Sequence, residues 1–189
     1  MIITGGSMTL LEAVNIVLRA LSEHTVSSTE IRHPSVTLAL DKIDESRQAV
    51  LNEGWWFNNI RITVNRESDG RVPYPADALA FVPDGFECIT RGGYLYNAKA
   101  KSFVFTEDVP GLVTYDVDWD DLPNAVQRMI AYQAAMMAYA DDVGDNAPAS
   151  VATGYAIALQ QCQSMHIRQR KFNARQRQSW RRYESARGG

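Results

Sequence analysis

The residues with the clearest chemistry are arginines and aromatics that are interleaved along the last part of the chain. Residues 160–189 hold eight basic residues and one acid, Glu184, so their net charge is about +7. Guanidinium groups bind carboxylates and phosphates, and aromatic rings add contact area or stack on bases. We expect this segment to dock on a partner through Arg168, Arg170, Lys171, Phe172, Arg175, Arg177, Trp180, Arg181, Arg182 and Tyr183.

The rest of the chain has the opposite charge. The whole sequence holds 19 Lys and Arg against 22 Asp and Glu, a net charge of −3, so residues 1–159 carry about −10. An acidic body repels phosphate, whereas a basic arm attracts acidic partners or nucleic acid. Three interpretations of the arm therefore stay open: docking on a protein, contact with DNA, and a solvated, disordered tail. Binding to DNA would weaken steeply as salt rises.

Four aspartates near the middle of the chain invite a calcium interpretation. They are Asp116, Asp118, Asp120 and Asp121. The string lacks the central glycine and the distal glutamate of an EF-hand loop. A helix N-cap and a solvated strand edge explain these residues better.

Catalysis has weak support in the sequence. Glu87, Glu107 and Asp108 could be nominated for glycan or peptidoglycan cleavage by paired carboxylates, but nothing in their spacing selects them. The three histidines, His24, His33 and His166, have no cysteine or serine partner at a meaningful spacing. We therefore expect no enzymatic activity, no metal and no cofactor.

Two further strings have both a binding and a structural interpretation. Trp55-Trp56-Phe57 could form a platform for carbohydrates or bases. The favoured interpretation is a strand opening with one tryptophan in the core and the other at a contact between subunits. Arg91-Gly92-Gly93 could cradle a phosphate, whereas a hairpin turn that needs positive φ accounts for both glycines.

The bulk composition is that of one soluble domain with an appendage. The chain has 189 residues, of which 46% are hydrophobic and 22% charged. No apolar run approaches the roughly 18 residues of a membrane span. Residues 1–7 show no signal pattern. The two cysteines, Cys88 and Cys162, lack metal spacing and favour free thiols over a disulfide. We expect a soluble protein made inside the cell.

Periodicity and capping signals predict the elements that must position these residues. Helices are expected over about 8–23, 34–54, 121–142 and 149–184. The first should open with a capping box formed by Thr9 and Glu12, the second should stop at Gly54 in a left-handed C-cap, and Asp121 should cap the third. Strands are expected over 55–64, 78–82, 86–97 (a hairpin), 102–106 and 112–119. The prediction is an α+β fold, in which a four-helix bundle carries an inserted antiparallel β-sheet (about 55–119) and a long C-terminal helix or arm. The body would be residues 1–159, and the basic arm residues 160–189.

Several strings resemble those of a known family. Residues 40–44 through Glu53-Gly54-Trp55-Trp56-Phe57-Asn58 are similar to the passage "helix, then GW-aromatic-N" of the tail tubular protein A family. These are the adaptor, or gatekeeper, proteins of short-tailed bacteriophages. The hairpin string Arg91-Gly92-Gly93-Tyr94-Leu95-Tyr96 and the helix start Leu122-Pro123 also resemble that family. The resemblance covers roughly residues 10–165, but the arm after Gln163 has no residue-by-residue match.

The resemblance implies a structural virion protein at the head-tail junction, made in the cytoplasm of the host bacterium. It would form a ring of twelve subunits beneath the portal protein, receive a tail nozzle (a tail tubular protein B-like protein), and pass DNA without binding it specifically. We expect the basic arm to dock on the portal. We expect two hairpin tips, Asp69-Gly70 and Arg91-Gly92-Gly93-Tyr94, to contact the nozzle or neighbouring subunits. A nucleic-acid-binding module remains the alternative.

Overall fold

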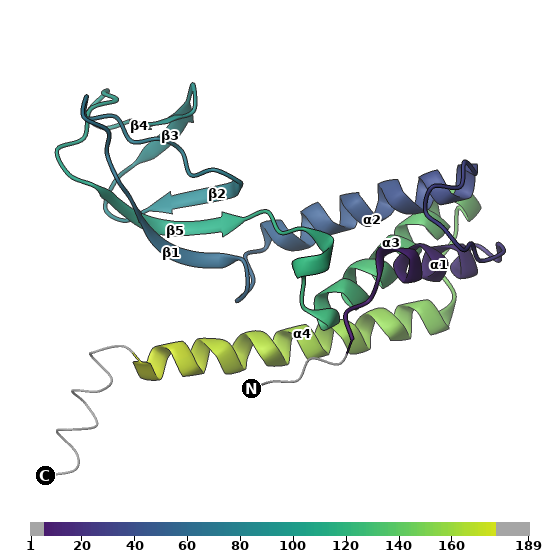
Figure 1. Cartoon of the computed structure of the whole chain (residues 1–189). Helices are drawn as coiled ribbons and strands as arrows, with labels where there is room; N and C mark the ends of the chain where they lie inside the picture. Colours follow the sequence, from purple (N-terminus) through teal and green to yellow (C-terminus); the bar gives the residue numbers. More distant parts are fainter. Residues whose placement is uncertain (1–5, 177–189) are drawn as a thin grey trace, which may run out of the picture. The chain divides into compact units, whose positions relative to one another are not determined.

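The structure is a computed structural model that describes residues 6–176, and it combines helices with antiparallel strands (Figure 1). The helices are α1 (Leu10–Ala20), α2 (Pro34–Asn52), α3 (Asn124–Val143) and α4 (Ala149–Gln176), with a short 3-10 helix, η1, at Trp119–Asp121. The strands are β1 (Asn59–Val64), β2 (Ala78–Pro83), β3 (Cys88–Arg91), β4 (Tyr94–Asn97) and β5 (Val109–Tyr115). The predicted mixed α+β class is confirmed.

The chain divides into two compact units, and the division falls inside α2. Of the described residues, 6–47 and 118–176 form a helical unit, and 48–117 form a strand unit. In the helical unit, α1 opens with the predicted capping box: the Glu12 amide donates to the Thr9 hydroxyl at 3.2 Å, and the Thr9 amide donates to the Glu12 carboxylate at 2.8 Å. The α1 stripe of Ala13, Val14, Val17 and Leu18 is buried.

Helix α3 is central to the helical unit, because α1 and α4 both pack against it. Its residues Val126, Ile130, Ala131 and Ala134 are fully buried. Helix α2 is tied to α3 by two polar contacts. The Ser46 hydroxyl donates to the Ile130 carbonyl at 3.2 Å, and Lys42 pairs with Asp141 at 2.6 Å. Hydrogen bonds to Asp141 and then to Glu45 raise the pKa of Lys42 above its usual range.

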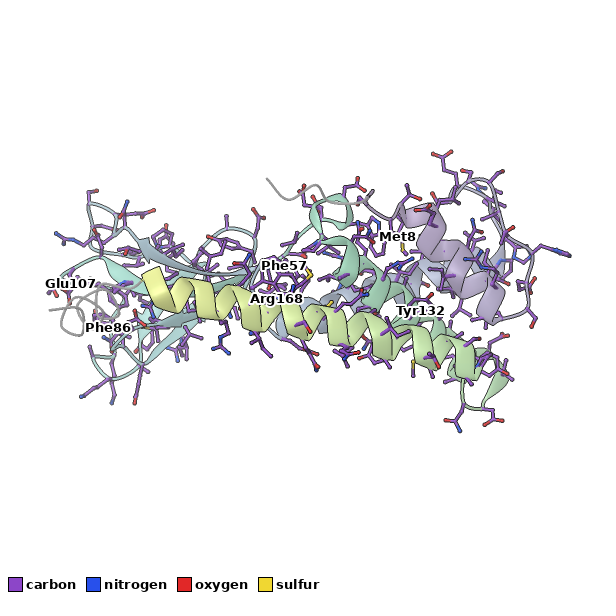
Figure 2. All side chains as sticks on the ribbon, turned by 90° about the horizontal axis from the view of Figure 1, so that it is seen from below. Met8, Phe57, Phe86, Glu107, Tyr132 and Arg168 are labelled. Carbon is purple, nitrogen blue, oxygen red and sulfur yellow. The ribbon has the colours of Figure 1, made fainter. Side chains whose placement is uncertain are left out.

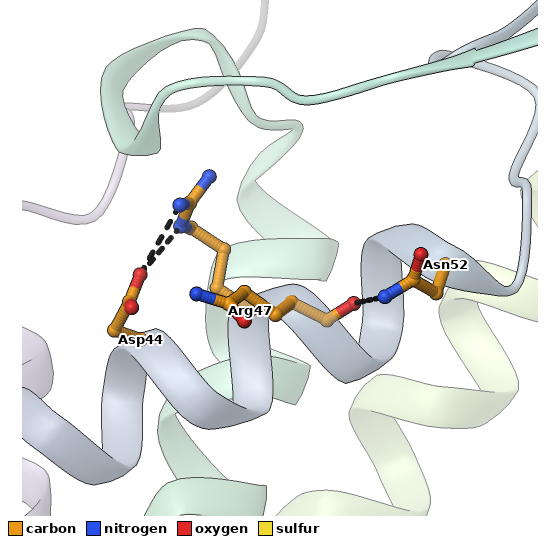
Figure 3. A network of polar contacts seen from close by, with 4 residues as sticks. Asp44, Arg47 and Asn52 are labelled. Carbon is orange, nitrogen blue, oxygen red and sulfur yellow. Dashed lines mark hydrogen bonds and ion pairs between the residues drawn. The ribbon is translucent and has the colours of Figure 1, made fainter. Parts of the chain in front are cut away.

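The exposed face of α2 carries a local polar network (Figure 3). The Arg47 guanidinium donates to Asp44 at 3.1 and 3.3 Å, and the Asn52 amide donates to the Gln48 carbonyl at 2.9 Å. Such surface pairs contribute little to stability, typically below about 1 kcal/mol.

The third helix begins later than predicted, and Asp121 does not cap it. The N-cap position is Pro123, without a side-chain hydrogen bond, and Asp121 ends η1 instead. The reason is local: the residue before a proline is driven out of the α region, and Leu122 is extended with ψ 141°. At its other end, α3 stops at Gly144, whose φ of +77° suits a left-handed cap.

In the strand unit, β1 and β2 flank β5 in a three-stranded antiparallel sheet, and β3 pairs with β4 in a separate hairpin. The unit has its own apolar core, made of Val72, Leu95, Phe105 and Val109. The predicted strand over 102–106 is wrong. Lys101 has a φ of +53°, which turns the chain so that Ser102 bridges back to Asn97, and Val104 then bridges to Arg71. Because the bridging partner changes from Asn97 to Arg71 within two residues, the segment forms isolated bridges and not a strand.

The aromatic string after α2 does not open a strand, contrary to the prediction. Residues 56–58 form a turn, and β1 begins at Asn59. Gly54 does end α2 in the predicted left-handed conformation, with a φ of +71°. Trp55 is buried and donates its indole N–H to the Val50 carbonyl at 2.9 Å. Its amide N–H donates to the Asn58 side chain, so hydrogen bonds rather than strand pairing set this segment.

Candidate functional site

The predicted docking arm begins within α4, the longest helix of the chain. Arg168 and Arg170 lie on α4 with exposed side chains, and Figure 2 labels Arg168. Lys171, Phe172 and Arg175 occupy helical positions of α4, and their side chains lie outside the part of the chain that is described. Arg177, Trp180, Arg181, Arg182 and Tyr183 lie outside the described residues altogether.

Helix lengths show where the arm leaves the packed part of the helical unit. Helix α4 has 28 residues and α3 has 20, which correspond to about 42 Å and 30 Å. The loop 144–148 joins them, and the two helices pack side by side (Figure 1). The C-terminal residues of α4 therefore extend beyond the start of α3.

The face of α4 that packs on α3 is apolar as far as Cys162. Val151, Ala158 and Cys162 are buried, and burial raises the pKa of the Cys162 thiol to about 12. One turn later His166 is half-buried, and burial, followed by the positive charge of Arg170, lowers its pKa. Both shifts are those expected of side chains that pack against a neighbouring helix.

A groove of about 370 Å³ runs between the N-terminal end of α3 and the middle of α4. Ala125 lines one side, and α4 contributes Ile157, Gln160, Gln161, Ser164, Met165 and Arg168. Except for Arg168, the sequence analysis had not singled out these residues for function. The signal that could have found them is the lack of charge along this part of the sequence.

The predicted hairpin at Gly92-Gly93 is confirmed. Arg91 pairs with Tyr94 across the turn, and the two glycines have φ of +57° and +79°. A β-carbon at either glycine would meet no atom within 4 Å. The glycines are therefore needed for backbone conformation and not for a close approach of the backbone to a ligand, which favours the turn over the phosphate cradle.

The hairpin also presents an arginine side chain stacked on an aromatic ring. The Arg91 guanidinium lies 4.2 Å from the centroid of the Tyr96 ring, and the Tyr96 ring meets Phe103 edge-to-face at 5.0 Å. Ile89, which pairs with Tyr96 and so shares its face of the hairpin, is 46% exposed. Arginine and aromatic residues are enriched at the centres of protein interfaces.

The two predicted tips are joined through Tyr94. The Arg71 guanidinium lies 5.5 Å from the centroid of the Tyr94 ring, and Arg71 also pairs with Asp69 at 3.3 Å. The structure thus brings Asp69 and Tyr94 to one region of the strand unit. Gly70, by contrast, is buried: a β-carbon there would lie 2.8 Å from Val104. Asp69 is exposed, so only one residue of that tip is accessible.

The alternative sites gain no support from the geometry. Among residues 6–176, no three His, Cys, Asp or Glu side chains lie close enough together to hold a metal ion, and this includes the predicted aspartate string. Glu87 and Glu107 are exposed, and neither lines the groove described above (Figure 2 labels Glu107). Asp108 accepts the Arg66 amide N–H at 2.9 Å, which is a structural contact.

Two buried polar side chains, Asn58 and Gln127, have structural roles that the sequence analysis did not predict. Asn58 donates to the carbonyls of Leu51 and Tyr115 and accepts the Trp55 N–H, so the last residue of the "GW-aromatic-N" string holds the strand unit together.

Gln127 does the same for the helical unit. Its side-chain oxygen accepts the Met8 amide N–H at 2.9 Å, and its amide donates to the Trp119 carbonyl at 2.7 Å.

Within the described residues no helix is long and apolar enough to span a membrane.

Comparison with known proteins agrees with this picture. The profile of a family described as "Tail tubular protein" matches residues 11–172. The chain is also 28% identical, over 183 residues, to tail tubular protein A of Klebsiella phage KP34, with 94% of this chain and 97% of that protein covered. The chain therefore belongs to the tail tubular protein family, and the resemblance seen in its sequence is confirmed.

Proposed function

We propose that this chain is a head-to-tail adaptor, a subunit of a homo-oligomeric ring of twelve that docks on the portal protein through its basic arm. The family makes the chain a structural protein of a phage tail. In the proposed role the ring sits at the head-tail junction and receives a tail nozzle, a tail tubular protein B-like protein. It continues the ejection channel, which DNA crosses without specific binding.

The observation that carries the proposal is the separation of charge along the chain. Residues 160–189 carry about +7 and the rest of the chain about −10. The basic run starts at Arg168, which lies near the first turn of α3, and continues into the part of α4 that extends beyond α3. Arg168 and Arg170 are exposed, so their guanidiniums are available to a partner. A protein partner fits better than DNA because the acidic body would repel a duplex held close to it.

The body is proposed to be the rigid part of the ring. Packing of α1 and α4 on α3, together with the Ser46 and Lys42 contacts of α2, supports a single four-helix bundle. The proposed body, residues 1–159, carries the strands as its insertion. The arm, residues 160–189, starts while α4 is still packed at Cys162.

The hairpin end of the strand unit is proposed to contact the nozzle or a neighbouring subunit. The exposed Arg91, the glycine turn, and Asp69 with Tyr94 provide a mixture of charge and aromatic surface. This mixture is typical of interface centres. The proposed function involves no catalysis, cofactor or membrane.

The test is negative-stain imaging of the chain mixed with the portal protein of the same phage, with duplex DNA as a control partner. The variant Arg170→Gln, Lys171→Gln, Arg175→Gln keeps the helix length and removes three charges that lie outside the groove lining. We expect rings of added density on the portal with the natural chain and their loss with the variant. Unchanged rings with the variant would contradict docking through the arm.

The nucleic-acid module remains the second candidate, because arginines with interleaved aromatics also suit phosphates and bases. It would be favoured by the absence of any portal complex together with DNA binding that collapses between low and physiological salt.

A further inference from the structure

The exposed side of α4 lacks charge over a long stretch. Between Ala149 and Ile167 the sequence has no Asp, Glu, Lys or Arg. Twelve of these nineteen positions are nevertheless exposed. An exposed helical face usually carries charged residues, so this uncharged face differs from an ordinary solvent-exposed one.

The other described helices behave differently. Exposed charged residues occur on α1 (Glu12, Arg19), on α2 (Asp41, Asp44, Glu45) and on α3 (Arg128, Asp141, Asp142). On α4 three large apolar side chains stand in their place: Ile157 and Ile167 are each 53% exposed and Met165 is 38% exposed. Depletion of charge with retention of apolar and methionine side chains is the compositional mark of an interface core.

Two of these three side chains, those of Ile157 and Met165, line the groove between α3 and α4. Gln160, Gln161 and Ser164 supply hydrogen-bonding groups, and Ala125 of α3 closes the other side. Amide side chains both donate and accept, so they can satisfy a polar backbone or side chain that enters the groove. Phosphate binding does not fit, since Arg168 is the single cation among the lining residues.

We propose that this groove is where a second copy of the chain packs, and this proposal rests on the adaptor ring proposed above. Residues 1–159 carry about −10, so two copies repel each other wherever charged faces meet. The uncharged face of α4 is a place where they can approach. Arg168 at the end of the groove is a cation available to a carboxylate of the neighbour, which has acids in excess. A ring requires head-to-tail contacts, so the groove receives a different surface of the neighbour.

Three full-length variants test the proposal in free solution, by sedimentation over a wide concentration range, and on the portal, by imaging. Gln161→Glu keeps the shape of the side chain and adds a negative charge inside the groove. We expect it to weaken self-association at least about tenfold. Gln161→Lys adds the opposite charge and should weaken it less, because the neighbour is acidic. Gln163→Glu is the matched control: the same change, on the same helix, at an exposed position outside the groove.

A photo-crosslinking residue at position 164 then identifies the occupant. Peptides of this chain joined to position 164 are the expected product, and crosslinks to portal or DNA in their place overturn the proposal. Equal weakening by Gln161→Glu and Gln163→Glu, or no self-association of the natural chain in either setting, overturns it too.

The outcomes separate this proposal from the adaptor role. Rings that form on the portal and are unaffected by Gln161→Glu would support the adaptor role and contradict the groove contact. Self-association that Gln161→Glu weakens, in a chain that does not bind the portal, would support the groove contact and contradict the adaptor role.

Discussion

Gly154 of α4 lies directly against the ring of Tyr132 on α3. A β-carbon at position 154 would come within 2.6 Å of two ring carbons, Cε1 and Cζ, a distance that real side chains do not adopt (Figure 2 labels Tyr132). The two helices approach closely here because residue 154 has no side chain.

The first prediction is that Gly154→Ala destabilises the protein. Alanine is the better helix former by about 1 kcal/mol, so propensity alone predicts a gain. Overpacking against Tyr132 costs about 1–3 kcal/mol, and we expect it to prevail, with a net loss of about 1 kcal/mol. Urea unfolding at constant m-value measures the change. In a Tyr132→Ala background the same substitution should become stabilising, and a loss of equal size in both backgrounds would refute the steric explanation.

The second prediction concerns Asn58, whose side chain is fully buried. Asn58→Ala leaves the Trp55 N–H and the carbonyls of Leu51 and Tyr115 without these partners. Each such loss in a buried site costs about 1–3 kcal/mol, so we expect at least about 3 kcal/mol of lost stability in denaturant unfolding.

The control for Asn58 is Asn52→Ala on the exposed end of α2. Asn52 also donates one hydrogen bond to a main-chain carbonyl, at 2.9 Å (Figure 3). Because water replaces that bond on an exposed helix, the change should stay within about 0.5 kcal/mol. Similar losses for the two variants would mean that burial does not decide the effect.

Local signals in the sequence predicted much of the fold. The Thr9–Glu12 box and Gly54 were read correctly because capping depends on a few adjacent residues. The pairing of segment 102–106 was misread, because the change of partner from Asn97 to Arg71 follows from a positive φ at Lys101 that the sequence does not announce. Asp121 was misread as a cap although Pro123 determines where α3 can begin.

The candidate sites likewise include one feature that local sequence predicted and others that depend on residues far apart in the sequence. The hairpin at Gly92-Gly93 was predictable because two adjacent glycines between strands specify the turn. The groove was not, since it needs Ala125 and Ile157, which are 32 positions apart, to lie side by side. Burial of Gly70 likewise depends on Val104, from a different segment of the strand unit.

The third prediction separates the turn from a phosphate cradle. Gly92 has a φ of +57°, so Gly92→Val should destabilise the hairpin by about 1–2 kcal/mol, whereas Gly92→Asn should be nearly neutral because asparagine tolerates this conformation. Hydrogen exchange of the β3 and β4 amides measures the local effect. Added inorganic phosphate should leave the exchange rates of the natural chain unchanged, and phosphate protection of residues 91–94 would favour the cradle instead.

The last prediction is a dependence of stability on pH that comes from His166. Burial and then Arg170 lower its pKa in the folded state. The unfolded chain, with a histidine pKa of about 6.5, therefore takes up the proton first as the pH falls, so His166 reduces stability below about pH 6.5 and stability rises with pH through that window. The neutral variant His166→Gln should show a shallower rise between about pH 5 and 7, measured as denaturant midpoints at each pH. Arg170→Gln should flatten the rise less, because burial is the larger cause. Parallel curves of denaturant midpoint against pH for the natural chain and His166→Gln would show that the histidine is protonated equally easily in the folded and unfolded states. The packing of α4 around position 166 would then have to be looser than it is in the structure.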